Sequence, residues 1–145
     1  MGPLDRDVID RRLLRLERIV RRLERDADTT LEQYLADEDV QDRVERRLQL
    51  SAQICLDIAN YLIARGDLEV PEEEENVFAV LVEGGALSPQ LGRRLRSLVG
   101  FRNILVHDYL TVDDQIVHRN MREGLRDLRD FARAIVEFLK RSAGP

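Results

Sequence analysis

The stretch from Val40 to Leu62, VQDRVERRLQLSAQICLDIANYL, decides the fold class of this 145-residue chain. Its apolar and small residues recur every three or four positions and form one stripe: Val40, Val44, Leu48, Ser51, Cys55, Ile58 and Leu62. That spacing follows the period of an α-helix, about 3.6 residues per turn. The stretch is therefore predicted to be a long amphipathic helix with one buried face.

The same helical period continues on both sides of this stretch, and no segment of useful length alternates with period two. Helices are predicted over about 5–25, within 28–37, over about 39–66, from Pro71 to Gly84, from Pro89 through 106, and over about 113–141. Residues 1–145 are expected to form one all-α domain, an antiparallel helical bundle of four long helices plus a short helix.

The composition suits such a bundle, because 43% of the residues are hydrophobic, 35% are charged and only 5% are aromatic. The single Cys55 cannot form an intrachain disulfide and is predicted to be a small buried hydrophobe. Two histidines and one cysteine do not build a zinc site, so no metal or cofactor is expected, and His118 is predicted to lie at the surface. No signal peptide or membrane span is visible, which favours a cytoplasmic protein with no membrane partner.

Charge is unevenly distributed along the chain. The net charge of -5 argues against an indiscriminate nucleic-acid binder. From Ser88 to Val106, however, there are four arginines and no acid. The run Glu72 to Glu75 is interpreted as the solvated start of a helix, where acids suit the helix dipole.

The segment RNILVHDY, residues 102–109, does not fit a plain core helix. On a helical projection at roughly 100° per residue, Arg102 and Tyr109 point in the direction of the apolar residues. Asn103 and His107 share the opposite, polar side, together with Arg93 and Arg96.

An arginine aimed along a core face needs a partner, because an unpaired buried charge costs several kcal/mol, on the order of 3–5. Asp57, at the edge of the apolar stripe of the helix predicted over 39–66, is the predicted partner. An ordinary structural reading stays open, since arginines at bundle edges often extend their charged head to solvent.

The pattern Arg102-Asn103, then His107 and Tyr109, resembles the R-x4-H-x-Y motif of HEPN domains. With RRLQLSAQICLDIANYLI, FAVLVEGGALSP and GFRNILVHDYLTVDDQIV, the chain from about Glu38 to Leu139 resembles the HepT group, the toxin half of bacterial and archaeal toxin–antitoxin pairs. The resemblance implies a helical two-fold homodimer and a metal-independent endoribonuclease. It also implies a minimal nucleotidyltransferase antitoxin that attaches AMP to the motif tyrosine, here Tyr109.

In this hypothesis His107 moves protons and Arg102 binds the scissile phosphate of the RNA substrate. Asn103 orients the imidazole or donates to phosphate, and Asp57 supports Arg102. Arg93 and Arg96 are candidate RNA-binding residues. One motif supplies one histidine whereas acid and base are two tasks, so a dimer with two motifs becomes part of the mechanism.

Two other functions stay open at this point. The chain is alternatively a non-catalytic interaction module that docks a nucleotidyltransferase and is modified by it, or a nucleotide-binding regulatory domain that uses Arg102 and Arg96 on phosphates. RNA cleavage by the purified protein in the presence of a chelator separates the first hypothesis from both.

Overall fold

The computed structural model describes residues 4–66 and 68–142, without the side chain of Tyr109. The described residues form helices and no strand: α1 (Arg6–Glu24), α2 (Leu31–Leu35), α3 (Glu38–Arg65), η1 (Glu74–Asn76), α4 (Val77–Glu83), α5 (Pro89–His107), η2 (Tyr109–Thr111) and α6 (Asp114–Ser142). The all-α prediction is confirmed. Each predicted helix is present, but the one predicted from Pro71 to Gly84 is shortened to α4, so two short α-helices, α2 and α4, accompany the four long ones.

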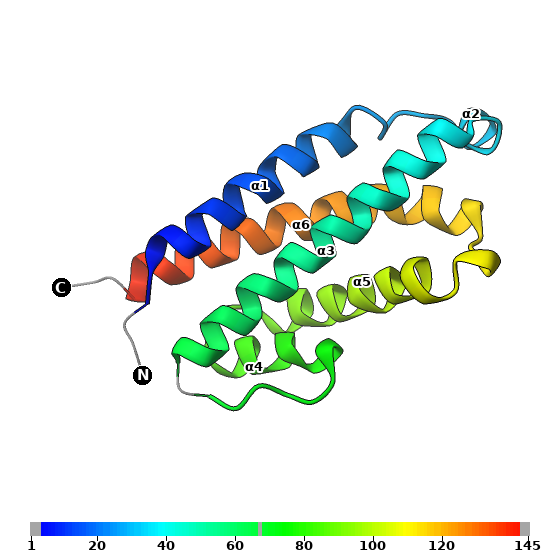
Figure 1. Cartoon of the computed structure of the whole chain (residues 1–145). Coiled ribbons are helices and arrows are strands. Elements are labelled where there is room, and N and C mark those ends of the chain that lie inside the picture. The colour runs from blue at the N-terminus through cyan, green and yellow to red at the C-terminus, as the bar shows by residue number, and fades with distance from the viewer. Residues whose placement is uncertain (1–3, 67, 143–145) are drawn as a thin grey trace.

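The four long helices α1, α3, α5 and α6 run side by side and alternate in direction along the chain (Figure 1). The start of α1 and the end of α6 lie at one end of the bundle, whereas α2 and the turn from α5 to α6 lie at the other. The predicted stripe of α3 is buried, and Cys55 within it is 1% exposed. In the part of the chain that the structure describes, no helix is long and apolar enough to cross a bilayer.

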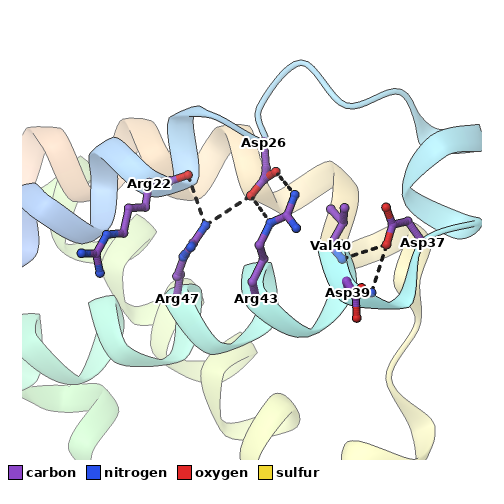
Figure 2. Close-up of polar contacts among 7 residues, drawn as sticks. All are labelled: Arg22, Asp26, Asp37, Asp39, Val40, Arg43 and Arg47. Atoms are coloured by element: carbon purple, nitrogen blue, oxygen red, sulfur yellow. Dashed lines mark hydrogen bonds and ion pairs between the residues drawn. The ribbon is translucent and has the colours of Figure 1, made fainter.

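A buried carboxylate ties the end of α1 to α3 (Figure 2). Asp26 accepts hydrogen bonds from Arg43 Nη2 at 2.7 Å and Nε at 3.0 Å, and from Arg47 Nη1 at 3.3 Å. Arg47 Nη1 also donates to the carbonyl oxygen of Arg22 at 3.4 Å. These contacts fix the point at which the chain leaves α1 for α2.

The helix predicted from Pro71 to Gly84 begins later than expected. Pro71 was predicted at its first position, but helical structure starts at Glu74 with a single 3-10 turn, and α4 starts only at Val77. Val77, Phe78 and Leu81 are the buried residues of α4. Leu68 and Val70 are exposed, and the glutamates that follow have no apolar side chain to bury, so residues 68–73 stay outside any helix and cross to α5.

Candidate active site at the end of α5

Local sequence signals place α5 and the motif that it carries. Ser88 caps the helix by accepting a hydrogen bond from the backbone N–H of Leu91 at 3.1 Å, and Pro89 occupies the first turn, as predicted. Gly92 faces α4, where a Cβ would lie 2.6 Å from Val82 Cγ2, so any larger residue would force the Val82 side chain or the helices to shift. The two helices therefore pack tightly at the start of α5.

Arg102 lies on the buried face of α5, as the helical projection predicts. It is 8% exposed and shares that face with Leu98, Val99 and Leu105. Its Nη2 donates to Glu74 Oε2 in η1. Its Nε is buried and has no hydrogen-bond partner among the residues that the structure describes.

The predicted partner of Arg102 was wrong. Asp57 accepts a hydrogen bond from Gln53 Nε2, one turn earlier in α3, at 2.9 Å. Glu74 takes the place expected for Asp57, because the segment after α3 returns across α5 and brings its acids over the arginines. The supporting role predicted for Asp57 therefore loses its structural basis.

The polar face of α5 also agrees with the projection. Arg93, Arg96 and His107 are exposed, and Asn103 is half-buried. His107 is the last residue of α5, and the N–H of Asp108 bonds to the carbonyl of Ile104 at 2.9 Å to close the helix. His107 is thus held by regular helix while its ring faces outward.

The chain turns sharply after the helix. Asp108 caps η2 with its carbonyl oxygen, which accepts from the N–H and the hydroxyl of Thr111, both at 2.9 Å. Tyr109 begins this 3-10 turn, but its side chain lies outside the described residues. The predicted modification residue is therefore placed by its backbone alone, two positions beyond His107.

The arginines of α5 have different partners. Arg94 joins α5 to α6, donating to Asp127 Oδ1 at 3.0 Å and to Asp130 Oδ2 at 3.1 Å. Burial raises the pKa of the Asp127 carboxyl, and the neighbouring Arg94 opposes that shift. Arg94 is therefore a structural residue. Arg93, Arg96 and Arg102 remain the candidates on α5 for binding an anion.

Two of the run of glutamates are not merely solvated. Glu74 pairs with Arg102, and Glu75 Oε2 lies 3.8 Å from Arg96 Nε. The sequence did contain a signal for this: an acid-free run of arginines next to an arginine-free run of acids. Glu74 is the residue at this site that the sequence reading missed.

His118 was predicted at the surface, but it is half-buried. Its ring packs against Tyr34 with centroids 5.5 Å apart, and its Nε2 lies 2.6 Å from the carbonyl oxygen of Thr29. Since a carbonyl only accepts, Nε2 carries the proton. His118 thus ties α6 to the loop before α2. In 4–66 and 68–142, no group of three acidic, histidine or cysteine residues lies close enough together to hold a metal ion.

The model of the family described as ribonuclease HepT-like matches residues 9–135. The chain belongs to the HepT-like ribonuclease family. This confirms the resemblance to the HepT group of HEPN domains and assigns the chain to a family of enzymes that cleave RNA.

Curated relatives of this HepT-like chain include two nucleases. The mRNA nuclease HepT of Shewanella oneidensis is 29% identical over 125 residues, which cover 86% of this chain and 93% of the relative. The tRNA nuclease HepT of Aphanizomenon flos-aquae is 26% identical over 139 residues, covering 96% and 95%.

Solved structures share the fold of this HepT-like chain. A tri-AMPylated HEPN toxin of Shewanella oneidensis, solved in complex with its MNT antitoxin, superposes with a TM-score of 0.83 at 28% identity, over 92% of this chain and 99% of that one. The cytosolic protein YutE of Bacillus subtilis superposes with a TM-score of 0.86 at 24% identity, over 100% and 97%, and so adds support for the fold alone.

Proposed function

We propose that this HepT-like protein is the toxin half of a cytoplasmic toxin–antitoxin pair and cleaves RNA as a metal-independent endoribonuclease, with Arg102 and His107 as its catalytic residues. One observation carries the proposal. In a chain of a ribonuclease family, α5 holds a buried arginine and ends on an exposed histidine five residues later.

In this mechanism the 2'-hydroxyl of the substrate attacks the neighbouring phosphorus, and the 5'-oxygen of the next nucleotide leaves. His107 transfers a proton, since histidine is the side chain that most often serves as general acid or base. Arg102 binds the phosphorane charge with its planar guanidinium, which stays protonated. Asn103, one turn before His107, orients the imidazole or donates to phosphate, and Arg93 and Arg96 bind flanking phosphates of the RNA.

A homodimer supplies the second histidine for the acid–base pair. Support comes from apolar side chains beside the motif, where Ile104, Leu110 and Ile116 are exposed, Leu110 by 87%. Ile104 and Ile116 help to line a surface cavity of about 280 Å³, together with Phe101 and Val112. Exposed apolar surface at one end of a charged protein favours an interface there.

The proposed antitoxin is a minimal nucleotidyltransferase that binds this end and attaches AMP to Tyr109. The Shewanella oneidensis toxin, solved tri-AMPylated in complex with MNT antitoxin, supports modification by AMP in such a pair. The added phosphate lies two residues from His107 in sequence and competes with RNA phosphate for Arg102. Modification therefore blocks the site both by charge and by bulk.

The alternative is a non-catalytic module that docks and is modified by the nucleotidyltransferase. The observation that favours it is the pairing of Arg102 with Glu74, which already neutralises the guanidinium. RNA cleavage by the purified protein decides between the two functions.

The test is cleavage of RNA in the presence of EDTA by the wild-type protein and by two variants. His107→Ala should abolish cleavage and keep the helical circular dichroism spectrum, because His107 is exposed at a helix end. Arg102→Lys should lower cleavage by about 100-fold or more, since an ammonium does not reproduce a bidentate fork. Cleavage by His107→Ala at the wild-type rate contradicts the catalytic assignment. A requirement for a divalent metal contradicts the mechanism.

A further inference from the structure

Adjacent glutamates meet two of the arginines on α5. Glu74 accepts from Arg102 Nη2, and Glu75 Oε2 lies 3.8 Å from Arg96 Nε. Both arginines are proposed above to bind RNA phosphates. The 3-10 turn η1 that carries the two glutamates packs directly on α5. An acidic segment of the chain thus lies where the negatively charged backbone of the substrate is expected.

The two members of the Arg102–Glu74 pair differ in burial. The side chain of Arg102 is 9% exposed, whereas that of Glu74 is 55% exposed. Arg102 is anchored by the core face of a long helix, and Glu74 belongs to a turn of three residues whose preceding residue, Glu73, makes no side-chain capping bond. The carboxylate is the member that can leave, since water solvates it readily and its turn is short.

The pair satisfies the guanidinium only in part. One hydrogen bond from Nη2 to Glu74 is present, and the buried Nε has no partner among the residues described. A phosphate that displaced Glu74 would break this single bond, and a bidentate contact to the guanidinium would replace it. Carboxylate and phosphate are the two anions that match this fork, so they compete for the same cation.

We propose that Glu74 is an internal counter-ion that occupies Arg102 in the free protein and is displaced by a phosphate of bound RNA. Glu74 thereby lowers the affinity of the protein for RNA, and it does so through Arg102 without touching the RNA. This inference rests on the proposed function, because it takes RNA phosphate as the displacing anion. It also accounts for a nuclease with a net charge of -5, since part of its acidity screens the site until substrate arrives.

Binding of a short single-stranded RNA, followed by fluorescence anisotropy, tests the inference without cleavage. The background is His107→Ala, so that the RNA stays intact. Adding Glu74→Gln should tighten binding about fivefold at low salt, and the gain should shrink as salt screens the pair. The matched control is Glu73→Gln, because Glu73 is exposed, adjacent, and without an ion pair within the described ranges.

A double-variant cycle shows whether the gain acts through Arg102. In a background that also carries Arg102→Gln, Glu74→Gln should give no more than the gain from Glu73→Gln. With Arg102 intact, equal gains from Glu74→Gln and Glu73→Gln would reduce the effect to net charge and overturn the inference. Weaker binding by the folded Glu74→Gln variant would overturn it too, since Glu74 would then help RNA to bind.

Cleavage kinetics separate this inference from the proposed function. With His107 intact, Glu74→Gln should lower KM about fivefold and leave kcat within about twofold. A fall in kcat at unchanged KM would overturn the counter-ion role. If the wild-type protein does not cleave RNA, the proposed function fails, while the binding test still decides the role of Glu74. Glu74→Asp keeps the charge on a shorter side chain and should give part of the gain, which provides a second variant if Glu74→Gln does not fold.

Discussion

Replacing Asp26 with alanine should destabilise the fold without touching the proposed site. Asp26 accepts three hydrogen bonds from arginines of α3, and its side chain is 6% exposed (Figure 2). The substitution removes the carboxylate and leaves Arg43 and Arg47 without it. The consequence should be a looser junction between α1 and α3, at the bundle end that also carries α2.

The expected loss follows from the exposure of the two arginines. Hydrogen bonds to charged groups contribute about 1.5–3 kcal/mol each when both partners are buried. Arg43 and Arg47 are 43% and 26% exposed, so water replaces much of what they lose. We therefore expect a total loss of about 2–3 kcal/mol, which corresponds to a fall of roughly 5–10 °C in Tm for a chain of this size.

Thermal unfolding followed by circular dichroism at 222 nm measures this loss, at one fixed protein concentration because dimerisation would shift Tm. Asp28→Ala is the matched control. Asp28 is fully exposed and its carboxylate lies 3.8 Å from Arg122 Nη2, so its loss should leave Tm nearly unchanged. A fall in Tm for Asp26→Ala no larger than for Asp28→Ala would refute the view that Asp26 holds the junction.

Two other predictions concern control and pH. Incubation with the cognate nucleotidyltransferase, ATP and Mg²⁺ should add one or more AMP units to Tyr109 and stop RNA cleavage. Mass spectrometry measures the addition, and Tyr109→Phe should gain no mass. An adduct on another residue would contradict this mechanism. Burial, with Asp114 and Asp42 nearby, raises the pKa of the Glu45 carboxyl, so the folded state binds the proton more tightly and loses stability as pH rises past the unfolded pKa of about 4.3. Glu45→Gln should therefore raise the free energy of unfolding at pH 7, by less than about 1 kcal/mol because the group is partly solvated. The same substitution should give no gain at about pH 3, where the carboxyl is protonated in both states. An equal gain at both pH values would exclude the charge as its cause.

The acidic segment before α4 changes how the charge of this protein is interpreted. A net charge of -5 is unfavourable for RNA binding when it is spread evenly. In the folded chain, Glu74 and Glu75 instead lie against Arg102 and Arg96. RNA binding therefore depends on the charge at the α5 surface with and without these carboxylates. The Glu74 variants test this dependence through their affinity for RNA.

The sequence alone was sufficient for the features that depend on neighbours a few residues apart. The three-to-four spacing of apolar residues determines helix and buried face, and so it predicted the stripe of α3 and the buried direction of Arg102. Ser88 and Pro89 marked the start of α5, because capping involves only the first turn. The motif from Arg102 to Tyr109 was readable for the same reason, since its spacing is local.

Only the tertiary structure decided which distant charges meet. Asp57 and Glu74 were both acids at positions open to pairing with Arg102, and nothing in the periodicity ranks one above the other. The choice depends on the path of residues 68–76, which leave α3, remain non-helical past Pro71 and return over α5. His118 was misplaced for the same reason, because its partners Thr29 and Tyr34 lie more than 80 residues away. Ion pairs and buried polar contacts act over a few ångströms in space, and a helical pattern does not encode which segments the fold brings within that range.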